Sequence, residues 1–122
     1  MKQRIWFEFT QQALHKYPGH PTLGEAHQHV FGFRVELGTK KDRELEFLEF
    51  RNIVKSEFLE DKLPSDRPSV MDFEDRSCET LAQELVAVIK KILPVEEWKG
   101  TPIIVSAAEN DEHAGAIVED KV

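Results

Sequence analysis

Three histidines near the N-terminus have the residue type and spacing that suit metal binding. His27 and His29 form a His-x-His pair, and His15 precedes them in the chain. The pair opens the alternating apolar segment 30–37, which is typical of a β-strand, and side chains two apart on a strand share one face. Two imidazoles can therefore reach one ion. A third ligand from another segment would complete a three-histidine site with one open position, as in catalytic rather than structural zinc sites.

Two predicted strands and the loop between them must position these histidines. Alternation of apolar and polar residues predicts the first strand over 2–10. Proline and glycine punctuation over 11–26 predicts a loop that contains His15. The second strand is predicted over 27–40. Its apolar side chains share the face of the two histidines, and they are Phe31, Phe33, Val35 and Leu37. The metal site is expected at the end of this apolar face.

A first helix is predicted after the second strand. Apolar residues recur at helical spacing over 48–62, and a short extension of the sheet is expected before them, over 45–47. The residues of the helical stripe are Phe50, Ile53, Val54 and Phe58. Pro64 is expected to end the helix, and a loop rich in Ser, Asp and Pro follows over 64–76.

A second helix and two further strands complete the predicted order. Ser77 is a candidate N-cap for a helix that runs to Leu93, and Pro94 stops it. Strands are predicted over 103–105 and 116–118. The order is strand, strand, helix, helix, strand, strand. It predicts an α+β fold in which two helices pack on one face of a four-stranded antiparallel sheet.

Composition limits the class of protein. The 122 residues are 40% hydrophobic and 32% charged, which predicts one globular domain over 1–122. A formal charge of −7 argues against a nucleic-acid partner. No apolar run approaches the roughly 18–20 residues of a membrane span, and the N-terminal residues do not resemble a secretory signal, so a cytoplasmic protein is expected. The single cysteine, Cys78, cannot form an internal disulfide, and burial at the start of a helix is its simplest interpretation.

Several segments, in this order, resemble the tunnelling-fold family of 6-pyruvoyltetrahydropterin and 6-carboxytetrahydropterin synthases. The segment 27–37 resembles the His-Gly-His strand of that family, Leu-Glu-Phe-Leu-Glu-Phe at 45–50 resembles its Ile-Asp-Phe helix entry, and Ser-Cys-Glu at 77–79 resembles its Pro-Thr-Ser-Glu helix start. The resemblance covers nearly the whole chain. His-Lys-Tyr-Pro at 15–18 and the acidic segment 108–115 are most similar to a short, divergent branch.

The resemblance implies a ligand set and an assembly. His15, His27 and His29 match the zinc ligands of the family residue by residue, and Glu109 matches the acidic residue that holds the pterin ring, although Glu112 competes for that role. One carboxylate can accept two adjacent N–H groups of a pterin in a strong paired interaction. The family fold further implies a homo-oligomer, a tetramer or hexamer, whose sheets close into a barrel with sites between subunits.

The chain also departs from the family pattern. The proton-transferring cysteine expected four residues before the His-x-His pair is Leu23 here. The Asp-His pair expected after the first helix is absent as well, because the segment 64–76 contains aspartates but no histidine. His113 is a candidate replacement, and an exposed turn residue is the simpler interpretation. The catalytic residues are therefore unknown.

The resemblance implies a function with one main alternative. The leading hypothesis is a zinc-dependent pterin lyase or synthase of the 6-carboxytetrahydropterin type. It would act on dihydroneopterin triphosphate or a related pterin in 7-deazaguanine (queuosine-type) biosynthesis. The alternative is a non-catalytic homologue that binds Zn²⁺ and a pterin or purine, or that serves only as an assembly scaffold. An unrelated small zinc-binding domain would require the order of the elements to be coincidental.

Overall fold

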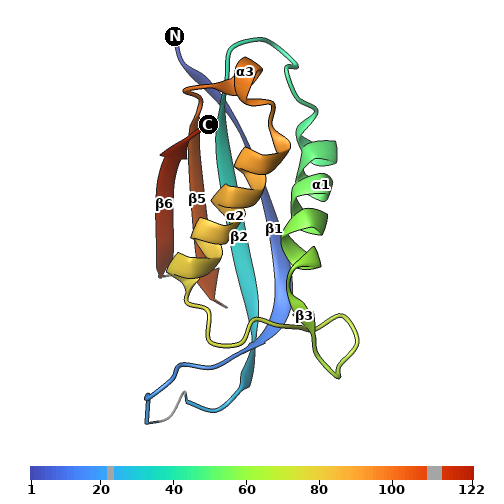
Figure 1. The fold of residues 1–122 in the computed structure, drawn as a ribbon, viewed down its shortest axis with the longest axis vertical. Coiled ribbons are helices and arrows are strands. Elements are labelled where there is room, and N and C mark those ends of the chain that lie inside the picture. The colour runs from blue at the N-terminus through green and yellow to red at the C-terminus, as the bar shows by residue number, and fades with distance from the viewer. Residues whose placement is uncertain (22–23, 110–113) are drawn as a thin grey trace.

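The computed structural model describes residues 1–21, 24–109 and 114–122, and it has an α+β fold. Its described residues form a six-stranded sheet and three helices (Figure 1). In chain order the elements are β1 (Gln3–His15), β2 (His27–Thr39), α1 (Phe47–Glu60), β3 (Leu63–Pro64), β4 (Met71–Asp72), α2 (Cys78–Ile92), α3 (Val95–Trp98), β5 (Pro102–Glu109) and β6 (Gly115–Lys121). The α+β class and the order of the major elements are confirmed.

The sheet has the strand order β3-β4-β1-β2-β5-β6. The four predicted strands are β1, β2, β5 and β6, which are neighbours in this order, and the pairings between them are all antiparallel. The prediction of only four strands is wrong, because β3 and β4 add two residues each and β4 pairs with β1 in parallel. Strands of two residues are too short to produce a visible alternation, so the proline-rich segment reads as a plain loop.

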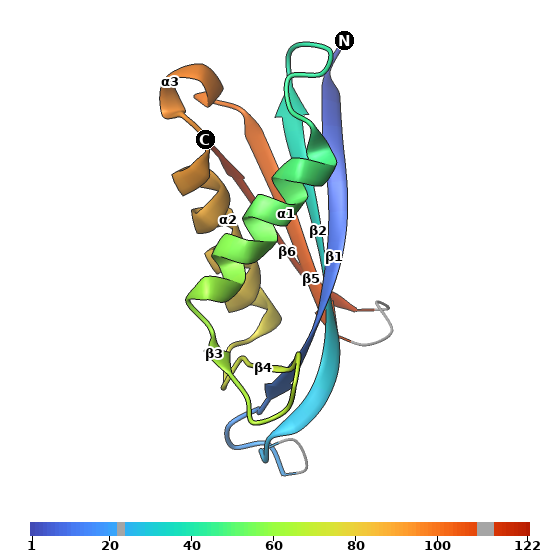
Figure 2. The ribbon, with the colours of Figure 1, turned by 90° about the vertical axis from the view of Figure 1, so that its right-hand side faces the viewer.

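Both long helices cover the same face of the sheet, as the edge-on view in Figure 2 shows. Phenylalanines fill the layer between the sheet and the two helices. Phe33 lies at the centre of this layer, and its ring centroid is 5.1 Å from that of Phe9 and 5.2 Å from that of Phe58. The apolar stripe on α2 and the odd-numbered residues 103–107 of β5 belong to the same core. Among the described residues, no helix has the length and apolar character needed to cross a membrane.

Local sequence signals predicted the bounds of α2 more accurately than those of α1. The Ser77 side chain accepts a hydrogen bond from the Thr80 main chain, so the predicted N-cap of α2 is confirmed. The predicted sheet extension over 45–47 is wrong, because the Glu46 carboxylate accepts from two main-chain N–H groups and starts α1 at Phe47. The helix ends at Glu60, before Pro64 is reached. Ile53, which the sequence places in the apolar stripe of this helix, is 45% exposed.

The first strand is longer than predicted, which changes the setting of one candidate ligand. β1 continues to His15 instead of ending at residue 10, and its whole length pairs with β2. His15 is therefore a strand residue and not a loop residue. The Pro and Gly residues of the connection lie beyond it, so they do not interrupt the strand.

The aromatic layer predicts a large effect of truncating its central ring. Phe33→Ala should lower the free energy of unfolding by about 3–5 kcal/mol, since it leaves a cavity in a layer that is already packed. Ile53→Ala on the exposed side of α1 should change it by less than about 1 kcal/mol. Urea denaturation followed by circular dichroism measures both, and equal losses for the two variants would contradict this assignment of the core.

Candidate metal centre

The three histidines lie where β1 ends and β2 begins. This end of the two strands is at the bottom of Figure 1. His15 and His27 are direct partners in the antiparallel register, and His29 lies two residues further along β2. Each imidazole offers one nitrogen, and these three nitrogens lie within 4.8 Å of one another. The ring centroids are 4.4 Å apart for His27 and His29 and 5.8 Å apart for His15 and His27. Register and strand alternation thus bring together the residues named from the sequence.

The ring of Phe31 packs against the histidine cluster from the side of the hydrophobic core. Phe31 is fully buried, and its ring centroid lies 5.6 Å from that of His15 and 6.0 Å from that of His29. Both contacts are edge-on, an arrangement that aromatic rings prefer. The His15 side chain is 7% exposed and that of His29 is 15% exposed. The cluster therefore has an apolar side and a more open side.

Glu109 supplies a carboxylate from a third strand. It is the last residue of β5 and pairs with Phe31 across the sheet, so its side chain shares the face of the histidines. One carboxylate oxygen lies 3.5 Å from His15 Nδ1, and the other lies 3.6 Å from His29 Nε2. The structure thus brings the predicted substrate-binding residue to the histidine cluster. Its competitor Glu112, together with His113 and Leu23, lies outside the described residues.

Burial and nearby charge act in opposite directions on the pKa of His15. Burial lowers the pKa of His15 from its ordinary value of 6.5, because the imidazolium form loses its solvation. The negative charge of Glu109 and a main-chain hydrogen bond with Arg76 raise it, but burial has the larger effect. His15 is therefore held in its neutral form near neutral pH, which is the form that coordinates a metal ion.

The residues present fit a divalent metal ion. His15 Nδ1 is buried and has no hydrogen-bond partner among the described residues, and such an atom calls for an explanation. The His27 Nδ1 lies 2.8 Å from the main-chain oxygen of Glu25, so it donates its proton there and leaves Nε2 as the free ligand atom. Nitrogens on one Zn²⁺ lie no more than about 4 Å apart, since each bond is about 2.0–2.1 Å. A small closure of the rings would reach that spacing.

A cleft of about 410 Å³ opens beside the cluster. His15 and Glu109 line it together with residues at the start of α2, including Cys78. Burial raises the pKa of the Cys78 thiol to about 11, with further contributions from the charges of Glu109 and Glu79. The thiol is therefore protonated at neutral pH and is not a ready nucleophile.

Sequence reasoning did not identify the main-chain groups that orient the rings. The Glu25 carbonyl fixes one nitrogen of His27, and main-chain hydrogen bonds of Leu14 and Lys16 hold the strand on either side of His15. Every residue carries a carbonyl, so no residue type or spacing marks these positions. The sequence predicts the segment 75–79 only as the end of a loop and the start of a helix. Asp75, Ser77, Cys78 and Glu79 line the cleft with Glu109, and this position depends on non-local packing.

Comparisons with known proteins agree with the fold. No protein-family model and no curated protein matches the sequence. One similar solved structure is a 6-pyruvoyl tetrahydropterin synthase from Plasmodium falciparum, with 12% sequence identity, a TM-score of 0.69 and 99% of each chain covered. Another is an uncharacterized protein from Wolinella succinogenes, with 12% identity, a TM-score of 0.64 and 99% of each chain covered. At such identities the likeness shows the fold, and the predicted tunnelling fold of the single chain is confirmed.

The opposing effects on His15 predict the direction of a pKa change. In metal-free protein, Glu109→Gln should lower the pKa of His15 further, because the Glu109 charge is the largest influence that raises it. NMR titration of the imidazole C–H signals measures this change, with His20 as an internal reference. An unchanged or higher pKa for His15 would contradict the assignment.

The lowered pKa of His15 also predicts how the stability of the metal-free protein changes with pH. The unfolded chain, with a histidine pKa near 6.5, binds a proton before the folded His15 does. His15 therefore makes the free energy of unfolding of the metal-free protein fall as the pH decreases below about 6.5, until the folded pKa is passed.

Proposed function

We propose that the chain is a zinc-dependent pterin lyase or synthase of the 6-carboxytetrahydropterin type. The observation on which this proposal rests is the convergence of three imidazoles and the Glu109 carboxylate at one end of the sheet. Its support from outside the chain is the shared fold with a protein named 6-pyruvoyl tetrahydropterin synthase. The proposed metal ligands are His15, His27 and His29.

The residues around the cluster have distinct proposed roles. When bound, Zn²⁺ would supply Lewis-acid polarisation of a hydroxyl oxygen on the substrate side chain. Glu109 would accept two hydrogen bonds from adjacent N–H groups of the pterin ring, an interaction that fixes both position and orientation. Phe31 would hold the His15 and His29 rings in place from below, since it contacts both. The proposed substrate is dihydroneopterin triphosphate or a related pterin, in a route to 7-deazaguanine (queuosine-type) compounds.

A non-catalytic pterin- or purine-binding protein is the second candidate. The observation that favours it concerns acid-base groups. Cys78 lines the cleft, but its raised pKa keeps it a thiol, and the segment 64–76 has no histidine. A site that binds Zn²⁺ and a pterin without turnover would need only the histidines and Glu109.

We also propose that several copies assemble edge to edge, as a tetramer or hexamer. Within the part of the chain that the structure describes, β6 pairs only with β5, and β1 is paired on one side alone over residues 3–12. Unpaired strand edges of this length expose rows of main-chain N–H and C=O groups. Pairing of the β1 edge of one copy with the β6 edge of the next would satisfy them and close a barrel.

The proposed ligand set predicts the metal content of the purified protein. The wild-type chain should bind one zinc ion, and His29→Ala should lose it while the fold is retained, since two ligands alone hold zinc weakly. Plasma emission spectrometry of dialysed protein measures this content. His20→Ala is the matched control, because His20 contacts Tyr17 and lies outside the cluster. Full zinc content in His29→Ala protein would remove His29 from the site.

Incubation with dihydroneopterin triphosphate separates the candidate functions. Release of triphosphate together with a tetrahydropterin product, lost in His29→Ala protein, supports the enzyme. Zinc binding with a pterin complex and no turnover supports the second candidate. In either case Glu109→Gln should weaken pterin binding at least about tenfold while zinc content stays unchanged, since the carboxylate that would pair with the ring is lost. Unchanged pterin affinity would contradict the role of Glu109.

A further inference from the structure

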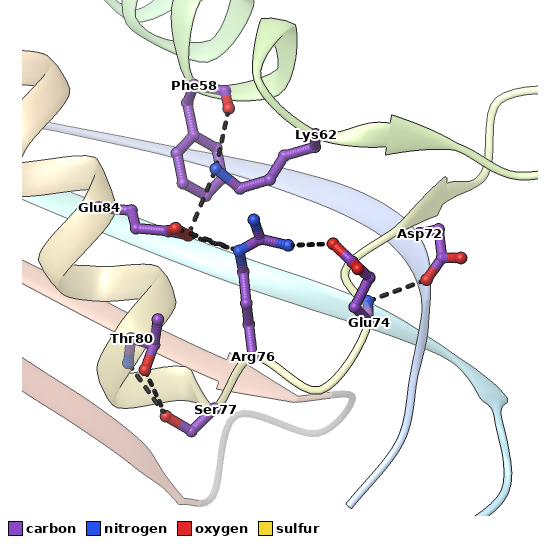
Figure 3. A network of polar contacts seen from close by, with 8 residues as sticks. All are labelled: Phe58, Lys62, Asp72, Glu74, Arg76, Ser77, Thr80 and Glu84. Carbon is purple, nitrogen blue, oxygen red and sulfur yellow. Dashed lines mark hydrogen bonds and ion pairs between the residues drawn. The ribbon is translucent and has the colours of Figure 1, made fainter.

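A second polar cluster lies between α1 and α2 and is drawn in Figure 3. The Glu84 carboxylate on α2 stands at its centre. Its Oε1 atom lies 3.0 Å from Arg76 Nε and 3.3 Å from Lys62 Nζ. Arg76 Nη1 in turn lies 2.9 Å from a carboxylate oxygen of Glu74. One carboxylate thus joins two cations that come from different segments of the chain.

Lys62 depends on Glu84 because its charge is withdrawn from water, whereas the Glu84 and Arg76 side chains are partly exposed, at 33% and 24%. The Lys62 side chain is 3% exposed, and its Nζ lies 3.3 Å from Glu84 and 3.4 Å from the Phe58 carbonyl oxygen. The same Nζ lies 4.3 Å from the centroid of the Phe58 ring. Removal of one partner from a buried ion pair leaves the other charge uncompensated, so the segment that carries it must shift or take up water. Glu84 is therefore the group on which this arrangement depends.

From Arg76 a short path of hydrogen bonds leads to the metal centre. The residues before Arg76 run alongside the end of β1. There Phe73 N–H donates to the Leu14 carbonyl oxygen at 2.9 Å, and Lys16 N–H donates to the Glu74 carbonyl oxygen at 2.9 Å. These two bonds enclose His15 on both sides.

We propose that Glu84 is a positioning residue for the metal centre, which it reaches through Arg76 and the main chain of residues 73–76. The inference rests on the proposed function, because it takes His15 as a metal ligand. Its physical basis is that a ligand binds well only when neighbouring groups hold its orientation. His27 and His29 lie on β2, away from this path, so the effect of Glu84 concentrates on His15.

Glu84→Gln tests the inference, because it removes the charge and keeps the shape of the side chain. Zn²⁺ affinity, measured by competition with a chelating dye near neutral pH, should fall about tenfold, the lower end of the effect seen for groups that orient metal ligands. Glu57→Gln is the matched control. It breaks the pair of Glu57 with Lys91, which is 3.8 Å long and has a largely exposed lysine on the same helix pair. Its Zn²⁺ affinity should stay within about twofold of wild type.

A second readout separates positioning from simple stabilisation. In metal-free protein, the imidazole ¹⁵N signals of His15 should move in Glu84→Gln protein, while those of His27 and His29 stay in place. If Glu84→Gln protein does not fold, Arg76→Lys provides the same test, because lysine keeps the charge but loses the planar fork that holds Glu84 and Glu74 together.

Two outcomes would overturn the inference. Folded Glu84→Gln protein with wild-type Zn²⁺ affinity would do so, as would unmoved His15 signals. A wild-type chain that binds no Zn²⁺ would instead remove the proposed metal function, and the His15 signals would still decide whether Glu84 acts on that ring.

Discussion

The antiparallel register of β1 and β2 is the constraint on which the metal centre depends. It places His15 opposite His27 and Ala13 opposite His29, so the three imidazoles share one face. Because side chains alternate along a strand, a slip of one residue would turn the His15 side chain to the other face of the sheet. The same slip would expose Phe7 and Phe9, which are buried. The apolar core therefore fixes the register, and the register fixes the ligand set.

The aromatic layer and the polar groups around the centre have complementary effects. Phe31 and its neighbours exclude water from one side of the histidines, which keeps His15 neutral. Glu109 brings a negative charge from β5 to the same point. The cluster of Glu84 and its cations holds the segment that flanks His15. The site therefore combines a neutral ligand, an adjacent carboxylate and a strand end whose position is fixed by its neighbours. This combination suits a cation and a polar ring.

Features determined by local sequence were predictable, and features determined by packing were not. The alternation of the second strand and the Ser77 cap were visible because each depends on residues close in the chain. The convergence of His15 with the His-x-His pair was also foreseen, although His15 was placed in a loop. The two-residue strands and the link between Glu84 and Arg76 could not be foreseen, since their partners lie far apart in the sequence or are main-chain groups. The position of Glu109 followed from a family resemblance, and the pairing of β5 with β2 explains it.

All three imidazoles belong to the first two strands, whereas the helices that bury the aromatic layer come later in the chain. During translation the three clustered histidines would leave the ribosome before α1 and α2 do. An ion held at that stage would clamp the two strands beside the loop that connects them and limit the registers in which the nascent strands can pair. Metal supply and correct folding of this protein would then be linked from the first steps of its synthesis.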